Sequence, residues 1–155
     1  MADVFAAVAG VAGPMSLRTI APCRPVPVIH FHGEFDEFTP FEGGKGKRSV
    51  TNTQHLSIPY TIQAWVAANG CPAEPAIETL RPIVEDGTVI ERHEYAPGRA
   101  GSEVVLYYVA RRRTYLARTS AAKITVHLGQ IDENLDANDE IWRFFCKHPR
   151  NRTSI

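Results

Sequence analysis

Two short apolar stretches limit what this chain can fold into. Residues 5–11 read FAAVAGV and residues 26–31 read VPVIHF, and both are almost free of polar side chains. Such stretches are typical of strands that are buried on both faces of a parallel sheet. Gly13-Pro14 ends the first stretch, and His32-Gly33 ends the second before a long loop of acidic and turn-forming residues. The pattern therefore predicts an α/β fold with a polar loop at the carboxyl end of the second strand.

The rest of the chain supplies two helices and a hairpin. Ser57 is a suitable cap for a helix over residues 57–70, with Pro59 in its first turn and Gly70 at its exit. Residues 89–95 alternate in polarity and residues 104–109 are apolar, which predicts a β-hairpin.

A last helix is predicted to begin at about Asp136. Asp139 and Glu140 fall in its first turn, where carboxylates favour the helix dipole. Trp65 and Trp142 lie on the apolar faces of the two helices and are expected in the core. A further strand is predicted over residues 119–128.

Composition excludes several classes of protein. The 155 residues suit a single domain, residues 1–155. Seventeen basic and seventeen acidic residues give a net charge of zero, so nothing draws the whole chain to nucleic acid or an anionic membrane. No apolar run approaches the ~20 residues of a membrane span, and the start resembles no secretion signal. We therefore expect a cytoplasmic protein with no nucleic-acid or membrane partner.

The loop after the second apolar stretch carries the most specific motif. Residues 24–44, RPVPVIHFHGEFDEFTPFEGG, contain an HGxxDxxxP pattern from His32 to Pro40. This pattern resembles the acid loop of secreted α/β-hydrolases of the polyhydroxybutyrate depolymerase and feruloyl esterase type. In that family the loop follows a late strand of the sheet.

Four other segments are similar to this family, in the family's order. Residues 2–13 look like the strand after the nucleophile helix, and residues 61–71 like the helix after the acid loop. Residues 101–109 look like the last strand and residues 135–149 like the terminal helix. The resemblance covers residues 2–109 and 129–149, and 110–128 form an aberrant loop between them. It implies the carboxyl-terminal part of an α/β-hydrolase sheet.

The resemblance implies ester hydrolysis by a serine, a histidine and an aspartate, without a cofactor. Asp36 matches the aspartate, which orients the histidine, and it is the one triad residue that carries over. The chain contains no GxSxG elbow. In the family that elbow lies upstream of the segment similar to residues 2–13, so here it would precede Met1.

The family's histidine loop, GGGHTWPG, is also missing. Residues 110–118 read ARRRTYLAR, and one permitted choice of codons for them gives PGGGHTWP when read one nucleotide later. We therefore interpret this segment as a frame-shifted copy of the histidine loop, which the nucleotide sequence of the gene can test. The shift leaves four arginines where the family has glycines and the catalytic imidazole.

Three functional hypotheses follow. The chain is a hydrolase-family protein derived from a secreted carboxylic ester hydrolase, with an incomplete triad and a small ester as substrate. Alternatively, it is a metal-dependent hydrolase of carboxylic or phosphate esters, because His30, His32 and Asp36 have the donor atoms for zinc or another divalent metal. His55, His93 or His127 would complete that site. The third alternative is a folded remnant without catalysis.

The resemblance also predicts association between copies of the chain. In the family, the strand similar to residues 5–11 pairs with a further strand that this sequence does not supply. A bare apolar edge favours pairing with another chain. We therefore expect a homo-oligomer formed through an exposed sheet edge.

Overall fold

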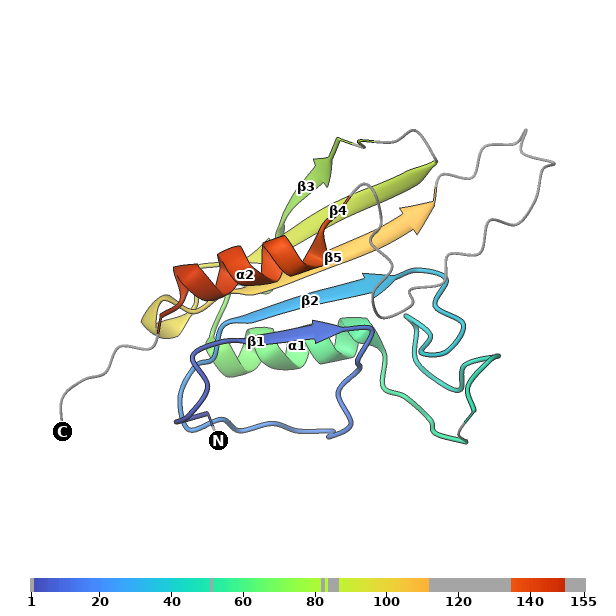
Figure 1. Ribbon diagram of the computed structural model, residues 1–155. Coiled ribbons are helices and arrows are strands. Elements are labelled where there is room, and N and C mark those ends of the chain that lie inside the picture. Colours follow the sequence, from blue (N-terminus) through green and yellow to red (C-terminus); the bar gives the residue numbers. More distant parts are fainter. Residues whose placement is uncertain (1, 51, 82, 84–86, 112–134, 150–155) are drawn as a thin grey trace.

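The computed structural model describes residues 2–50, 52–81, 83, 87–111 and 135–149. These residues form one sheet with a helix on each face (Figure 1). In chain order the elements are β1 (Val8–Val11), β2 (Val28–Gly33), α1 (Ile58–Asn69), β3 (Ala76–Leu80), β4 (Thr88–Tyr95), a short 3₁₀ turn (Arg99–Gly101), β5 (Val104–Arg111) and α2 (Ala137–Lys147).

The sheet is open and mixed, with the strand order β1-β2-β5-β4-β3. β1, β2 and β5 run parallel, whereas β4 is antiparallel to both β5 and β3. The predicted α/β class is therefore confirmed. The predicted hairpin is also confirmed, because β4 and β5 are antiparallel neighbours with Tyr95 opposite Val104.

Helix α1 begins and ends where the sequence predicts. The Ser57 hydroxyl accepts a hydrogen bond from the Tyr60 backbone N–H at 3.2 Å, and a proline lies in the first turn. Gly70 ends the helix in the left-handed conformation, with φ of 65°. Asn69, the last helical residue, is fully buried and bridges to Val26 just before β2. This bridge fixes the helix beside the start of the central strand.

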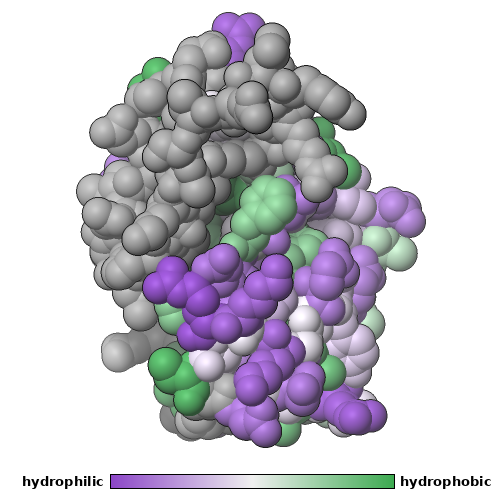
Figure 2. All heavy atoms as spheres, turned by 90° about the vertical axis from the view of Figure 1, so that its right-hand side faces the viewer, coloured by the Kyte–Doolittle hydropathy of each residue, from purple (hydrophilic) through white to green (hydrophobic). Residues whose placement is uncertain are grey.

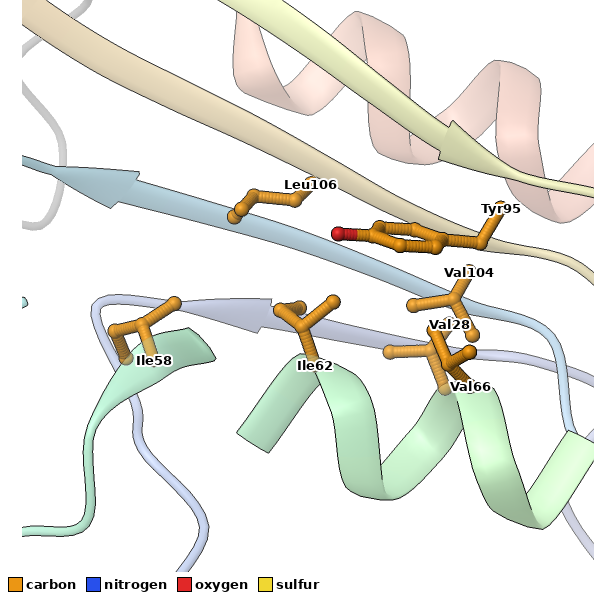
Figure 3. Close-up of a cluster of buried hydrophobic side chains, with 7 residues drawn as sticks. All are labelled: Val28, Ile58, Ile62, Val66, Tyr95, Val104 and Leu106. Atoms are coloured by element: carbon orange, nitrogen blue, oxygen red, sulfur yellow. The ribbon is translucent and has the colours of Figure 1, made fainter. Parts of the chain in front are cut away.

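Two apolar clusters lie on opposite faces of the sheet because alternate residues of a strand point to opposite sides. The cluster under α1 is drawn in Figure 3 and contains Val28, Ile58, Ile62, Val66, Tyr95, Val104 and Leu106. The cluster under α2 contains Ile29, Phe31, Ile90, Val105, Tyr107 and Phe144. β2 and β5 contribute to both clusters, so both are covered on each side.

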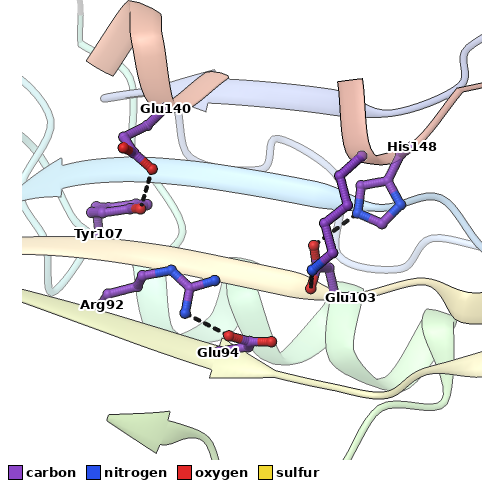
Figure 4. Close-up of polar contacts among 7 residues, drawn as sticks. Arg92, Glu94, Glu103, Tyr107, Glu140 and His148 are labelled. Atoms are coloured by element: carbon purple, nitrogen blue, oxygen red, sulfur yellow. Dashed lines mark hydrogen bonds and ion pairs between the residues drawn. The ribbon is translucent and has the colours of Figure 1, made fainter. Parts of the chain in front are cut away.

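Polar contacts also hold α2 against the sheet (Figure 4). Glu103, at the start of β5, accepts hydrogen bonds from Lys147 at 2.7 Å and from His148 at 2.8 Å. Near the other end of α2, the Tyr107 hydroxyl donates to Glu140 at 2.7 Å. The carboxylate of Asp136 caps the helix, which begins where the sequence predicts.

Some predictions need correction. The first strand begins at Val8 rather than residue 5, and Phe5 is half exposed. β3 was not predicted; it is an edge strand of mostly exposed residues. Trp142 is 69% exposed because it lies on the outer side of α2, away from the core. The predicted strand over residues 119–128 falls outside the described residues. Within the described part, no helix is long and apolar enough to cross a membrane.

Candidate functional site

The candidate site lies at the carboxyl ends of β2 and β5. The loop that carries Asp36 leaves β2 at Gly33, where the Glu34 backbone N–H bonds to the Val109 carbonyl of β5 at 2.8 Å. Figure 2 looks onto this end of the molecule, whose described surface is largely hydrophilic with a few apolar side chains among the polar ones. The parallel strands thus place the Asp36 loop where open α/β sheets hold their ligands.

Asp36 is held in a fixed orientation by its own loop. Its Oδ1 atom accepts hydrogen bonds from the backbone N–H groups of Phe38 at 2.8 Å and Thr39 at 2.9 Å. This arrangement is an Asx turn, in which the side chain replaces a backbone acceptor. The carboxylate is only 7% exposed. Oδ1 is therefore bound by the loop itself. These hydrogen bonds fix the orientation of the carboxylate without a ligand.

His32 holds the same turn from the strand side. Its Nε2–H donates to the Thr39 carbonyl, at a distance of 2.9 Å, so the proton of the neutral ring lies on Nε2. Thr39 is thus bound twice, through its N–H to Asp36 and through its C=O to His32. Burial lowers the pKa of His32, although the Thr39 carbonyl and Asp36 act in the opposite direction. At neutral pH the ring is an uncharged positioning group.

His30 is the second buried imidazole of β2. It is 3% exposed, and its ring stacks on that of His32 with centroids 5.7 Å apart. Burial, and secondarily the neighbouring His32, lowers the pKa of His30 to about 4. Gly10 of β1 lies opposite, and a Cβ atom there would be 2.6 Å from His30 Nδ1. The imidazole therefore fills the space that a side chain on β1 would take.

The second oxygen of Asp36 is the part of the site free to act on another group. Asp36 Oδ2 lies 3.9 Å from His32 Nε2, whose proton already goes to Thr39. Among the described residues, none donates a hydrogen bond to Oδ2. A nearly buried carboxylate with one oxygen fixed and the other available is suited to orient and stabilise an imidazolium.

Several aromatic side chains come from the same loop as this carboxylate or from the neighbouring strand β5. Phe35 and Phe38 are 51% and 42% exposed, and the guanidinium of Arg48 lies over the Phe38 ring. The Phe41 ring lies between those of His32 and Tyr108. Burial, with the nearby Glu34, raises the pKa of Tyr108. The loop that carries Asp36 therefore exposes apolar as well as polar side chains.

The structure brings two of the three proposed metal ligands close to each other. His32 and Asp36 are neighbours, and His30 stacks behind His32. Across the described residues, no group of three or more His, Cys, Asp or Glu side chains is arranged to hold a metal ion. His93 bonds to Glu91 instead. His127 lies outside the described residues, as do Arg112, Arg113 and Arg118.

The buried serine of the described part of the chain lies away from Asp36. Ser102 is buried and its hydroxyl has no hydrogen-bond partner, but it precedes β5, at the opposite end of that strand from the site. Of the three triad residues that the resemblance implies, the site as described contains Asp36 alone.

Comparisons with known proteins give no match. No family model, no curated protein and no solved structure is similar enough to this chain to be recognised as related. The class that the fold and the site define is an α/β protein with an oriented carboxylate at the carboxyl end of its parallel strands.

Sequence reasoning singled out Asp36 and the two histidines but did not predict the contacts among them. The two hydrogen bonds of the Thr39 backbone, to Asp36 and to His32, were not predicted. The spacing of Asp36 and Thr39 is a common Asx-turn pattern and could have indicated the first of them. The role of Gly10 was also missed. Only the strand register shows that it faces His30.

Proposed function

We propose that Asp36 is the acid of an ester-hydrolase site whose serine and histidine must be supplied by other residues. The observation that carries the proposal is the fixed carboxylate, with Oδ1 bound by two backbone N–H groups and Oδ2 available. In a serine hydrolase the acid holds the imidazole in the correct tautomer and stabilises its charged form. The resemblance of residues 24–44 to the acid loop of esterases supports the same role.

The proposal also predicts that the chain alone does not hydrolyse esters. Losing the serine or the histidine of a triad costs on the order of a million-fold in rate. The sequence has no GxSxG elbow, and residues 110–118 hold no histidine. The chain is thus an acid-bearing half of a hydrolytic site, and its substrate class is a small carboxylic ester.

The direct test restores the missing parts. Residues 110–117 are replaced by PGGGHTWP, and this variant is combined with the amino-terminal fragment, through the nucleophile helix, of a feruloyl esterase. We expect turnover of p-nitrophenyl acetate by the combination and none by either part. Asp36→Asn in the restored chain should lower kcat roughly ten-thousand-fold. An uncharged amide no longer holds the catalytic histidine in the tautomer that accepts the proton of the serine.

Asp36→Asn is chosen because the amide oxygen can still accept the two backbone hydrogen bonds, so the loop is preserved. Glu37→Gln is the matched control, since Glu37 is an exposed neighbour whose carboxylate meets Arg48 at the surface. Equal activity in Asp36→Asn and Glu37→Gln would contradict the proposal. So would a complete absence of turnover in the restored combination when both parts are folded and bound to each other.

A metal-dependent hydrolase is the second candidate, and two unpartnered nitrogens favour it. His30 Nε2 and His32 Nδ1 are buried without a hydrogen-bond partner. The unmodified chain is assayed with p-nitrophenyl acetate and with bis(p-nitrophenyl) phosphate, before and after EDTA. Turnover that EDTA abolishes and zinc restores would support the metal site in place of the triad acid. No turnover in any arm, restored chain included, would leave a folded remnant without catalysis.

A further inference from the structure

His30 points to the same face of the sheet as the apolar cluster under α1, because alternate residues of a strand share a face. Two of its neighbours on that face belong to the cluster. Val28 precedes it on β2, and Leu106 lies opposite it on β5. The other two neighbours do not: Gly10 lies opposite on β1, and His32 follows on β2. The imidazole therefore lies between packed apolar side chains, a glycine and a second imidazole.

The space that His30 occupies exists because residue 10 has no side chain. A Cβ atom on residue 10 would lie 2.6 Å from Nδ1 and 3.2 Å from Cε1 of the His30 ring. These distances are too short for carbon contacts, so the ring would have to move. Val28 and Leu106 are buried in a close-packed cluster and leave no room for it. The neighbour that takes up the displacement is His32.

His32 connects this pair of imidazoles to the loop of Asp36. The two rings are nearly parallel, at an interplanar angle of 8° and with centroids 5.7 Å apart. His32 Nε2–H donates to the Thr39 carbonyl at 2.9 Å. The Thr39 N–H donates in turn to Asp36 Oδ1, also at 2.9 Å. A packing contact, a ring stack and two hydrogen bonds thus connect β1 to the carboxylate.

We propose that Gly10 and His30 are positioning residues for the carboxylate of Asp36. They act through His32, which stays within hydrogen-bond distance of the Thr39 carbonyl only while His30 has the space above Gly10. The Thr39 turn then fixes Oδ1 and sets the direction of Oδ2. The inference rests on the proposed function, since it treats Asp36 as the acid of the site. A displacement of about 1 Å in such a group can cost on the order of a hundredfold in rate.

Hydrogen exchange followed by NMR tests this connection without any enzyme activity. The N–H groups of Phe38 and Thr39 are the reporters, because both donate to Asp36 Oδ1. Gly10→Ala should speed their exchange by about tenfold or more relative to the amides of β4 and β5, because the turn opens locally. It should also shift the Nε2–H resonance of His32, whose hydrogen bond to Thr39 is disturbed.

Gly13→Ala is the matched control. It makes the same chemical change three residues further along, but a Cβ atom on residue 13 would meet the Val11 carbonyl oxygen at 3.7 Å, which is an ordinary contact distance. Exchange at Phe38 and Thr39 should stay within about twofold of that in the parent chain. A general loss of stability would instead speed the amides of β4 and β5 to the same extent.

A double variant tests the route through His30. In a His30→Ala background, the methyl group that Gly10→Ala adds has no ring to displace. Gly10→Ala should therefore cause no further increase in the exchange of the Thr39 N–H. A full additional increase would show that the effect of residue 10 reaches the loop without His30, and it would overturn the proposed route.

Two substitutions of His32 test the hydrogen bond itself. In His32→Gln the amide nitrogen takes the place of Nε2 and can still donate to the Thr39 carbonyl, so slow exchange should be kept. His32→Leu removes the donor and should speed exchange at Thr39 by about tenfold or more. Equal exchange in His32→Gln and His32→Leu would overturn the proposal, as would equal exchange in Gly10→Ala and Gly13→Ala. The His32 pair decides the question where Gly10→Ala does not fold.

Activity of the restored combination is the second readout. With the amino-terminal fragment at saturation, Gly10→Ala should lower kcat by about tenfold to a hundredfold and leave KM nearly unchanged, because the acid moves and the substrate does not. A change in KM alone would contradict the positioning role. No turnover in the restored parent would refute the hydrolase proposal, whereas the exchange measurement would still decide whether Gly10 and His30 position Asp36.

Discussion

At the scale of single residues, the stacked imidazoles of β2 make stability depend on pH. Unfolded His30 takes up a proton near pH 6.5, whereas the folded ring does so near pH 4. Between these values the unfolded chain binds more protons. The contribution of His30 to the free energy of unfolding is therefore fully present above about pH 6.5. It falls as the pH is lowered, until the folded ring is also protonated.

We expect the free energy of unfolding in urea to drop by roughly 3 kcal/mol between pH 7 and pH 4 through His30 alone. His30→Met should remove this part of the slope, because methionine is apolar and does not titrate. His55→Gln, in a loop and outside the stacked pair, serves as the control. An unchanged slope in His30→Met would mean that other groups cause the acid sensitivity.

Asn69 carries a second prediction at this scale. Its Oδ1 accepts from the Val26 N–H at 2.9 Å, and its Nδ2 donates to the Val26 carbonyl at 2.7 Å. Asn69→Leu leaves both backbone groups buried and unpaired, so it should destabilise the fold by about 2–4 kcal/mol. Chemical denaturation measures this. Ala67→Ser, on the exposed side of α1, should change stability by less than about 0.5 kcal/mol.

At the scale of elements, Glu103 fastens α2 to the sheet. Burial would raise its pKa, but the hydrogen bonds and charges of Lys147 and His148 outweigh this effect and lower it. The contribution of this carboxylate is therefore present at neutral pH and is lost as the pH falls through its lowered pKa.

We expect Glu103→Gln to destabilise the protein by about 1–3 kcal/mol at pH 7, because it leaves a buried site with a weaker acceptor. A double-mutant cycle with His148→Gln should show a coupling of at least about 0.5 kcal/mol. Arg143→Gln, which removes only a surface ion pair with Glu140, is the control. Zero coupling between Glu103 and His148 would show that the apolar face of α2 is sufficient to keep this helix on the sheet.

The predictability of the elements depends on local signals. α1 was predicted to within a residue at each end because Ser57 and Gly70 are strong cap residues. β4 and β5 were found from alternation and an apolar run. β3 was missed since the side chains of Ala76–Leu80 are mostly exposed and give no apolar pattern. It exists because the free edge of β4 offers backbone partners, which a local pattern does not show.

At the scale of the whole molecule, the two apolar clusters share one sheet and should unfold together. Trp65 lies on α1 and Trp142 on α2, on opposite sides of the sheet. The single-tryptophan variants Trp142→Phe and Trp65→Phe should give urea midpoints that coincide with that from circular dichroism, as in a two-state transition. Midpoints that differ between the two probes would show that one layer unfolds independently.

The candidate site was predictable only in part. The motif around Asp36 predicted a carboxylate on a loop after a buried strand, and the structure places Asp36 on such a loop. The sequence did not show that the Thr39 backbone would form hydrogen bonds with both Asp36 and His32. Those contacts depend on where β2 ends relative to the turn. It also did not predict that His30 and His32 would stack instead of spreading toward a shared ion.

The mixed direction of the strands has a consequence for the order in which the chain acquires its structure. β4 and β5 are close in sequence and can form their hairpin early in folding, because closing a short loop costs little entropy. β2 must instead find β5 across a long stretch of chain, with Val28 opposite Val104. The hairpin then acts as a template, and the parallel half, with Asp36 at its end, is completed last. Slow folding steps should therefore be concentrated in the β2–β5 pairing, where contact order is highest.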